Sequence, residues 1–531
     1  MFEQSNRLAI NIETSTAWWI ARSEFTMASY INLKSKLSTL DFQDQEKPVA
    51  FFEYDLDGTP YVVIPKIQRK LLEFILGRRL RFQISEYEDL ENATYKKPKF
   101  DPLPHQEPIL EKAEKVWRDE GETDKRICIS IPPGGGKSFC AAYLAWKMKA
   151  KFIFIVYSGK LVKQTWENFC GFLGREGMLM LEKGSDFPDI RWDKVKGLFI
   201  THSMIRSLSK TYSFEYVINV LQEKMGAKIL IMDEFDRETG SCYKLDAFTD
   251  FPYNLRLTGT TYRSLKPDDQ VFQTVYRHCH MLGNEVQLEK KRTLHLINWK
   301  FNPTPKEYTK MMLFEERLFK NFYVEKIAQK DILLDFIMNQ FYKKDDSIIK
   351  QMFDDNGQVV IYAGRIENCQ IVKKKLIDNF EIDENDIGVY NSDISDREKD
   401  EAEKKKWIIT TMSSLGRGYD NKNIRVLIYL EFSFSSSEFE QTCSRCSRIG
   451  GKPGHVIYGL DHSFWKVENN WNKKVREGLI DKHFKQVFNY TIPDSWKDYY
   501  VYGYRRTSAM AAEIMKEQKE RERTLKWSKR I

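Results

Sequence analysis

Short apolar runs recur along this 531-residue chain, each followed by a polar or glycine-rich turn and a helix-favouring segment. Continuous apolar strands that alternate with helices are typical of a mostly parallel sheet covered on both faces. The runs fall into two groups, so the pattern predicts two α/β domains. The first group lies within residues 125–131, 151–158, 197–205, 227–236 and 254–263, and the second within 357–365, 386–392, 406–420, 424–432 and 455–461.

The segments outside these groups have different patterns. Near the N-terminus, FFEYDLDGTPYVVIP reads as two strands joined at Asp57-Gly58, a favourable hairpin turn, and KIQRKLLEFILG has helical spacing. Trp18 and Trp19 are expected in a core. The predicted segments are a small α+β domain over 1–98, an α/β domain over 99–264, a connection with helices over 265–350, a second α/β domain over 351–490, and a basic helical tail over 491–531.

Composition narrows the class of protein. Apolar residues make up 42% of the chain, enough for real cores, and no run of 18 uncharged apolar residues occurs. The first thirty residues show no signal-peptide pattern, so we expect a cytoplasmic protein. Eight cysteines are spread along the chain, and the pair Cys443 and Cys446 has no second pair at zinc-ligand spacing. Reduced thiols without structural zinc are expected.

The net charge of +8 favours a polyanionic partner. Arg78, Arg79 and Arg81 stand beside Phe82, a combination that suits a phosphate-facing surface but equally a solvated face. The segment from Arg505 to the C-terminus holds nine Lys or Arg and four Glu. A solvated helix and a nucleic-acid contact explain that tail equally well, and both interpretations stay open.

The clearest chemical signal is KRICISIPPGGGKS, a strand that ends in prolines and glycines and leads into a helix. Glycines let backbone N–H groups face phosphate oxygens, the lysine reaches the β- and γ-phosphates, and the serine hydroxyl binds Mg²⁺. The loop departs from the usual pattern because Ile131 replaces its first glycine. The expected ATP-binding residues here are Pro133, Gly134, Gly135, Gly136, Lys137 and Ser138.

A second signal follows about a hundred residues later. Asp233 and Glu234 come directly after the apolar run AKILIM, where the strand should end. The sequence therefore predicts that Asp233, with Ser138, holds Mg²⁺ and that Glu234 polarises the attacking water. Gln106 stands about thirty residues ahead of the phosphate loop, the position of an adenine-reading glutamine in several ATPase families.

With these motifs in order, residues 103–465 resemble a superfamily 2 helicase. The motifs that carry the resemblance are LPHQ, PPGGGKS, VYSGKLVKQTW, ITHSM, DEFD, LTGTT, VVIYAGR, TTMSSLGRGYD and QTCSRCSRIG. The resemblance implies two tandem RecA-like motor domains with parallel sheets, preceded by the small α+β domain. Only the first motor domain has a phosphate loop, so ATP is expected between the two.

The resemblance also implies roles for residues of the second motor domain. The motif QTCSRCSRIG has Ser444 and Ser447 where the family has glycines, and its two arginines lie three apart, which predicts one helix face. The catalytic residues implied are Glu234, Arg448 as the finger on the γ-phosphate, Arg445 beside it, and Gln441. Gly418 and Asp420 are implied as ATP-binding, and Gly159, Thr201 and Thr411 as strand contacts by motif position.

Departures from the RNA-helicase pattern favour DNA. Asp236 makes the acidic motif DEFD, LTGTT replaces a serine–alanine–threonine motif, and one extra residue lies between Thr411 and Gly418. The nearer resemblance is to phage DNA helicases of the UvsW type, which implies the cytoplasm of a bacterial or phage-infected cell. We therefore expect an ATP- and Mg²⁺-dependent DNA helicase or translocase that unwinds, reanneals or branch-migrates duplex or branched DNA in replication, recombination or repair. The alternatives are an RNA helicase and an ATPase switch that binds nucleic acid without unwinding it.

Overall fold

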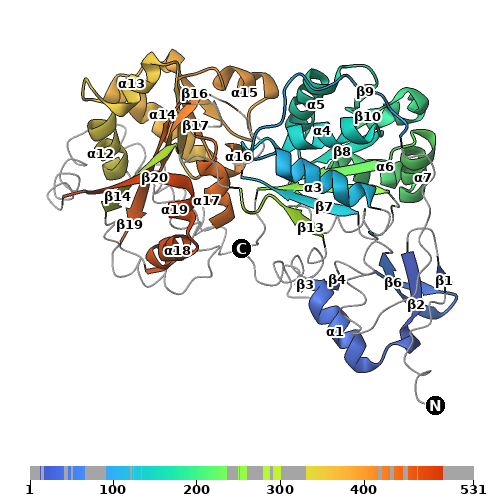
Figure 1. The fold of residues 1–531 in the computed structure, drawn as a ribbon. Helices are drawn as coiled ribbons and strands as arrows, with labels where there is room; N and C mark the ends of the chain where they lie inside the picture. The colour runs from blue at the N-terminus through green and yellow to red at the C-terminus, as the bar shows by residue number, and fades with distance from the viewer. Residues whose placement is uncertain are drawn as a thin grey trace, which may run out of the picture. The chain divides into compact units, whose positions relative to one another are not determined.

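The fold comes from a computed structural model, which divides into two compact units over residues 1–289 and 290–531 (Figure 1). Each unit is described by itself. The structure describes residues 12–13, 17–40, 46–48, 52–65, 91–119, 122, 125–132, 134–235, 245, 249, 251–259, 279–286, 291–299, 331–415, 421, 423–430, 436–446, 452–462 and 465–493.

The N-terminal region is a small α+β domain, as the sequence predicts. Its antiparallel sheet has the order β1-β2-β6-β5, and the turn Asp57-Gly58 joins the last two strands, with the Gly58 amide donating to Asp55. Trp18 is buried, whereas Trp19 is partly exposed. The elements are β1 (Ile12–Glu13), β2 (Ala17–Ala21), η1 (Arg22–Glu24), α1 (Met27–Leu37), β3 (Ser38–Leu40), β4 (Glu46–Pro48), β5 (Phe52–Leu56) and β6 (Thr59–Pro65).

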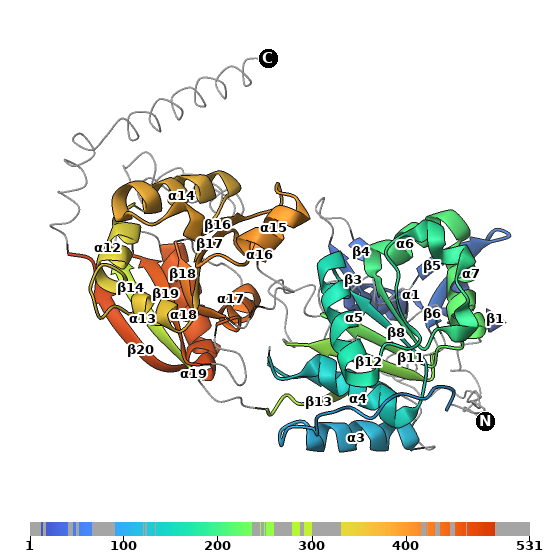
Figure 2. The same ribbon diagram turned by 90° about the horizontal axis from the view of Figure 1, so that it is seen from above.

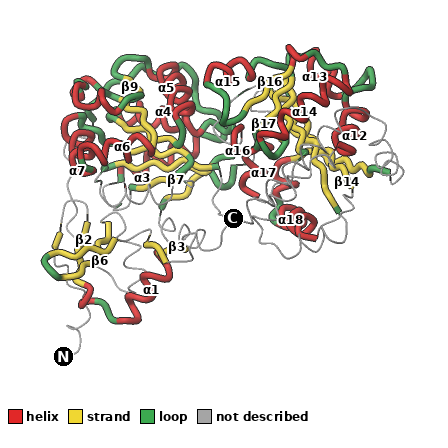
Figure 3. The backbone as a smooth tube through the Cα atoms, turned by 180° about the vertical axis from the view of Figure 1, so that it is seen from behind, coloured by secondary structure: helices red, strands yellow, loops and turns green. Residues whose placement is uncertain are grey.

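The first unit also contains a seven-stranded sheet in which every pairing is parallel. Its strands, in spatial order, are β13 (His280–Leu282), β7 (Arg126–Ser130), β12 (Tyr253–Thr258), β11 (Ile229–Asp233), β8 (Phe152–Val156), β10 (Gly197–Thr201) and β9 (Met178–Met180). Consecutive side chains of its central strands alternate between two apolar cores, so both faces are covered (Figure 3).

Different helices cover the two faces of this sheet. One core contains α3 (Glu107–Arg118), α4 (Lys137–Met148) and α5 (Gly159–Leu173). The other contains α6 (His202–Tyr212), α7 (Phe214–Asn219) and the π-helical turn η5 (Val220–Lys224), with the short turns η3 (Gly184–Asp189) and η4 (Trp192–Lys194) nearby. The loops after the strands are therefore left at one edge of the sheet, where ligands of open parallel sheets bind.

The second unit repeats this architecture (Figure 2). Its parallel strands, in spatial order, are β16 (Ile387–Tyr390), β17 (Trp407–Thr410), β15 (Gln358–Tyr362), β18 (Ile424–Tyr429), β19 (Gly454–Asp461), β14 (Arg292–Trp299) and β20 (Phe484–Thr491). One face packs on α12 (Asp331–Phe341), α13 (Ile348–Asp354) and α14 (Ile366–Phe380). The other packs on α16 (Met412–Leu415), α17 (Ser436–Cys443), α18 (Trp465–Arg476) and α19 (Leu479–His483), while η7 (Glu384–Asp386) and α15 (Asp396–Ala402) flank β16.

The two tandem parallel sheets confirm the predicted fold class, but residues 265–350, expected to hold a connection with helices, also contribute two strands. Strand β13 completes the first sheet, and β14 lies inside the second. The sequence hides β14 because buried polar groups interrupt its apolar run. His295 is buried with its ring nitrogens 3.2 Å from the Tyr490 hydroxyl and 3.0 Å from a nitrogen of His455, so its polarity is satisfied inside the sheet.

Candidate nucleotide site

The loop between β7 and α4 has the backbone conformations that a phosphate cradle needs. Gly134 and Gly136 have φ of +84° and +86°. A Cβ on Gly135 would lie under 3.0 Å from the Ile131 side chain, so glycine is required there for space, whereas Gly134 and Gly136 are required for conformation. Ile131 itself has no positive φ and is fully buried in the core, which explains why a β-branched residue fits where related loops carry glycine.

Lys137 is the first residue of α4, and Ser138 is the second. The Lys137 Nζ atom donates a hydrogen bond of 3.1 Å to the Ile131 carbonyl, which holds the ammonium group over the start of the loop. Gly136 precedes the helix in the left-handed conformation, so the first N–H groups of this 12-residue helix face the loop. The positive N-terminal end of α4 and the Lys137 ammonium group thus both lie at the loop, where they would stabilise a bound anion.

The Gln106 side chain holds the loop through a hydrogen bond to its backbone. Its side chain is 2% exposed, its Nε2 donates to the Gly135 carbonyl at 2.9 Å, and its Oε1 accepts from the Leu103 amide at 2.9 Å. A Cβ on Gly136 would lie under 3.0 Å from this amide. An amide group has two N–H donors and two acceptor lone pairs, so Gln106 retains one of each for the adenine that the sequence assigns to it.

His105 is a second clamp, which the sequence analysis missed. Its Nε2 lies 3.0 Å from the same Gly135 carbonyl. Because a carbonyl only accepts, that nitrogen carries the proton and donates. The one signal available in the sequence was its position beside Gln106, which is weak evidence.

Replacing His105 with phenylalanine keeps an aromatic ring but removes the donor to Gly135. Loss of one such hydrogen bond is worth about 0.5–1.5 kcal/mol, so KM for ATP should rise roughly two- to tenfold with a smaller change in kcat. Steady-state ATPase kinetics measure KM and kcat separately and so test this expectation. A KM equal to that of the wild type would show that Gln106 alone holds the loop.

Asp233 ends β11 at the same edge of the sheet, and Glu234 is the first residue after the strand. Strand β12 separates β11 from β7, and the register sets Asp233 level with Leu257, hence with Ile129. Two strand spacings make the distance between β7 and β11 about 10 Å. The acidic pair therefore lies within reach of a phosphate chain held by the loop.

Glu234 has a left-handed backbone with φ of +45°, unusual for a residue with a side chain. Its amide donates to Asp233 Oδ1 at 3.0 Å, and the following Phe235 is fully buried. Such a conformation costs on the order of 1–3 kcal/mol and persists where the surroundings enforce it, often at functional sites.

The candidate strand contacts follow other strands. Gly159 begins α5 after β8, is exposed, and has open space around it. Thr201 ends the neighbouring strand β10, where its hydroxyl accepts from the Met204 amide at 3.0 Å and caps α6. Both therefore lie at the sheet edge that carries the phosphate loop. In the second unit Thr411 is buried, and its hydroxyl accepts from the Ser414 amide at 3.2 Å, so it caps α16.

The second unit carries the arginine motif at the end of α17. Gln441 is 8% exposed, and its Oε1 is buried without a hydrogen-bond partner among the described residues. The helix ends at Cys443, so the prediction that Arg445 lies on a helix face is wrong. The Ser444 side chain donates to the Gln441 carbonyl at 2.7 Å, which ends the helix and places Arg445 in the following turn.

Two contacts fix this turn and helix, and the sequence analysis found neither. Arg292 of β14 donates to the carbonyls of Cys446 at 2.7 Å and Ser444 at 3.3 Å. Glu440 is fully buried and accepts from Lys482 and His483 at 2.7 and 2.9 Å. Burial alone would raise the pKa of Glu440, but His483 and Lys482 lower it to about 2, so the carboxylate stays charged. Long sequence separation hides both interactions.

Some predicted site residues lie outside the described residues: Pro133, Gly418, Asp420, Arg448, Arg78, Arg79 and Arg81, with Asp236 of the acidic motif and the tail after residue 493. None of the described helices is long and apolar enough to cross a membrane.

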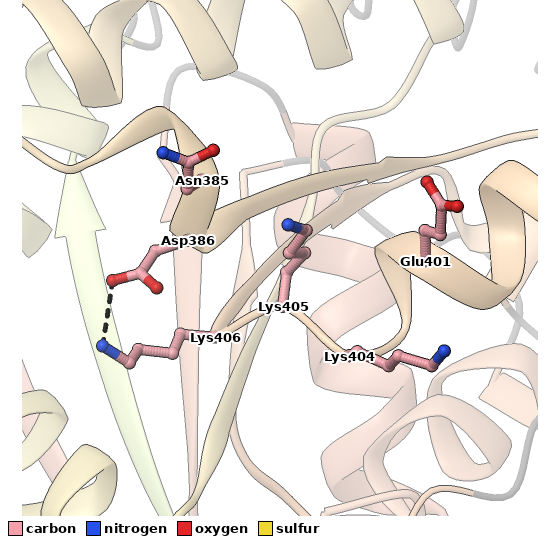
Figure 4. A pocket seen from close by; sticks show the side chains of 6 residues that line it. All are labelled: Asn385, Asp386, Glu401, Lys404, Lys405 and Lys406. Carbon is pink, nitrogen blue, oxygen red and sulfur yellow. Dashed lines mark hydrogen bonds and ion pairs between the residues drawn. The ribbon is translucent and has the colours of Figure 1, made fainter.

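A surface pocket in the second unit lies apart from these motifs (Figure 4). Its volume is about 400 Å³, and it is lined by Asn385, Asp386, Glu401, Lys404, Lys405 and Lys406. It opens where β16 and β17 begin, opposite the strand ends that lead to Thr411. Lys406 pairs with Asp386 at 2.9 Å. Two carboxylates offset the three lysines, so this pocket is a poor anion site.

Comparison with known proteins gives two family matches. Residues 99–263 match the family described as type III restriction enzyme, res subunit, and residues 343–450 match the helicase conserved C-terminal domain. No curated protein matches the chain by sequence.

Solved structures resemble the chain in fold. The ATP-dependent Type ISP restriction-modification enzyme LlaBIII bound to DNA has 14% identity and a TM-score of 0.50, over 75% of this chain and 32% of that one. Dbp5 of S. cerevisiae bound to RNA and ADP BeF3 has 15% identity and a TM-score of 0.47, over 76% of this chain and 92% of that one. A fragment assigned to the HsdR subunit of a type I restriction enzyme from Vibrio vulnificus YJ016 has 14% identity and a TM-score of 0.48. The match covers 74% of this chain and 69% of that one.

Proposed function

Because this chain is an ATP-dependent helicase of superfamily 2, we propose that it is a DNA helicase or translocase, acting on duplex or branched DNA in replication, recombination or repair. One observation carries the ATPase part of the proposal. A clamped glycine loop and two consecutive carboxylates lie at the same edge of one parallel sheet. A loop that cradles phosphates and a base that activates water are the two parts that phosphoanhydride hydrolysis requires.

The loop residues have separate tasks in this proposal. Backbone N–H groups of Gly134, Gly135 and Gly136 surround the phosphates, and Lys137 exchanges its hydrogen bond to Ile131 for one to the γ-phosphate. Ser138 and Asp233 supply the oxygen ligands that Mg²⁺ prefers. The metal would neutralise phosphate charge. Glu234 accepts the proton of the attacking water, and Gln106 reads the adenine.

The second unit would complete the charge stabilisation. We assign Arg448 to the γ-phosphate, with Arg445 and Gln441 beside the nucleotide. The buried Gln441 Oε1 without a partner among the described residues fits this role, because a buried acceptor gains from a bound water or nucleotide group. The hydrogen bonds from Arg292 to Ser444 and Cys446 would hold the turn in position. Gly418 and Asp420 are assigned to the nucleotide as well.

ATP binding and hydrolysis would then change how the two units grip a strand. Gly159, Thr201 and Thr411 are proposed strand contacts, and phosphate contacts of this kind carry no sequence information. Besides its capping bond, the Thr201 hydroxyl lies 2.9 Å from the Ser203 hydroxyl, and the Thr411 hydroxyl donates to the Ser414 hydroxyl at 2.8 Å. Contacts through backbone N–H groups therefore fit these positions better.

The choice of DNA over RNA rests on motif differences. The motifs DEFD and LTGTT differ from those of RNA helicases. The family matched by residues 99–263 is described as a restriction-enzyme subunit, and restriction enzymes act on DNA. Steady-state ATPase assays with forked DNA, duplex DNA and single-stranded RNA test the choice. Stronger stimulation by RNA would favour the RNA helicase instead.

The N-terminal domain offers a second test. If Arg78, Arg79 and Arg81 contact duplex phosphates, changing all three to glutamine removes three contacts. The slope of log affinity against log salt should then become shallower by roughly 2.7, about 0.9 per contact. Duplex binding at several salt concentrations measures this slope. The matched control changes Lys343, Lys344 and Lys404, exposed lysines of the second unit, to glutamine. Equal slopes in the two variants would remove the arginine cluster from the interface.

A further inference from the structure

The N-terminal domain holds an arginine flat against an aromatic ring. Arg22 follows β2, and its Cζ lies 3.4 Å from the centroid of the Tyr30 ring of α1. This stacking fixes the plane of the guanidinium group. No side-chain hydrogen bond or ion pair joins Arg22 to another residue of the described part of the chain. Its planar set of N–H donors therefore stays available while its orientation is fixed.

A small cavity lies beside this stack. Its volume is about 280 Å³, and it is lined by Arg22, Tyr30, Glu53, Asp55, Pro60, Tyr61 and Val62. Pockets for drug-sized ligands run from about 300 to 1,000 Å³, so this one suits a single ring system. All lining residues come from β5, β6, α1 and the turn after β2, within one small domain (Figure 1).

The cavity offers acceptors opposite these donors. Glu53 and Asp55 are two residues apart on β5, so they share a face of the strand, and both are exposed. Asp55 accepts from the Gly58 amide with one oxygen, and no interaction joins Glu53 to another described residue. Neither carboxylate forms an ion pair with Arg22. The cavity thus presents separate donor and acceptor groups that do not satisfy one another.

Tyr30, Pro60 and Val62 supply the remaining wall. Glu53 pairs with Val62 and Asp55 with Pro60, so these side chains share one face of the sheet, whereas the Tyr61 ring packs edge-on against Trp19 at 6.0 Å on the other face. A flat ligand can stack against the guanidinium plane of Arg22, since cation–π contacts of arginine add to base stacking in single-strand binding proteins.

We propose that this cavity binds one unpaired guanine base of a nucleic-acid strand. Guanine presents the acceptors O6 and N7 on one edge, which arginine recognises bidentately, and N–H donors on another, which a carboxylate accepts. Arg22 takes the first edge and Glu53 the second. Thymine lacks an amino group for the carboxylate and binds least well. The inference rests on the proposed action on nucleic acid and adds base preference to it.

The test uses the full chain without ATP. An all-thymine strand of about a dozen nucleotides is compared with the same strand carrying one central guanine, by fluorescence anisotropy. One guanine prevents self-association of the probe. The wild type should bind the guanine strand at least about fivefold more tightly. Glu53→Gln and Arg22→Lys should each abolish this ratio, since the first loses a charged acceptor and the second the planar fork.

The matched control is Asp57→Asn. It removes one negative charge from the same hairpin but outside the cavity, and asparagine tolerates the left-handed φ of +53° there. This variant should keep the guanine preference. Equal affinity of the wild type for the two strands would overturn the proposal, as would a preference that survives in Glu53→Gln. Stimulation of the ATPase by the all-thymine strand does not depend on guanine binding. Measuring it therefore tests the proposed function separately from the proposed guanine site.

A free nucleotide could supply the same base. Guanosine monophosphate is therefore used as a competitor. The proposal predicts that it displaces the guanine strand only at concentrations far above that of the unlabelled strand, because the strand adds backbone contacts. Displacement by the mononucleotide at equal concentration would overturn the assignment to a strand.

Discussion

Replacing Lys137 with alanine is expected to reduce ATP hydrolysis at least about a hundredfold. Lys137 is the one side-chain cation that the sequence places in the loop, and its Nζ already lies within 3.1 Å of the Ile131 carbonyl. Removing a single pre-positioned donor from a developing negative charge costs about 10²–10³ in rate in other enzymes. Phosphate release under saturating ATP and DNA measures the effect.

The control for this variant is Lys147→Ala. Lys147 belongs to the same helix, α4, but lies at its far end and pairs at 3.7 Å with Glu114. Partly exposed pairs of this kind contribute about 1 kcal/mol or less, so the control should fold and retain its turnover. If Lys137→Ala kept a tenth of the wild-type turnover, the assignment of the phosphate loop would be wrong.

Changing Glu234 to glutamine should separate ATP binding from ATP hydrolysis. Glutamine preserves the size of the side chain and leaves Asp233 and the loop in place, but it cannot accept a proton from water. A lost general base lowers the rate typically by 10²–10⁴, so turnover should fall about a hundredfold or more while ATP still binds. Single-turnover hydrolysis and nucleotide binding in the presence of Mg²⁺ are the measurements.

Glu176→Gln is the matched control, because its side chain is 91% exposed and pairs only loosely, at 3.4 Å, with Lys196. It should behave as the wild type. Failure of Glu234→Gln to bind ATP would mean that Glu234 belongs to the nucleotide-holding residues and is not the base.

The sequence predicts most of the fold because the central strands are nearly uninterrupted apolar runs. The runs at 127–131 and 229–233 correspond to β7 and β11, and the hairpin at Asp57-Gly58 is confirmed. Strand β14 was missed since His295 is polar in the sequence and only the tertiary pairing with Tyr490 and His455 shows how it is buried.

The candidate site, like the fold, has a part that the sequence predicts and a part that it does not. Local motifs locate the loop and the acidic pair, because spacing along the chain carries that information. The second hydrogen bond on Gly135, from His105, could not be predicted, because it depends on how a distant turn folds over the loop. Arg292 lies more than 150 residues from the turn it holds, and nothing in its neighbourhood marks it.

Two features of the site correct or extend the motif comparison. Ile131 replaces glycine without strain because its side chain belongs to the core. Arg445 lies beyond the end of α17, so its orientation depends on the turn held by Arg292 and not on helical spacing.

The central claim is that ATP hydrolysis drives the separation or movement of DNA strands. Strand displacement on a labelled forked DNA tests it most directly, beside an RNA fork of the same sequence, with Lys137→Ala as the background. The account predicts displacement of the DNA fork that requires hydrolysable ATP, with the RNA fork displaced far more slowly. Equal or faster displacement of the RNA fork, or vigorous ATP hydrolysis with no movement of either substrate, would contradict it.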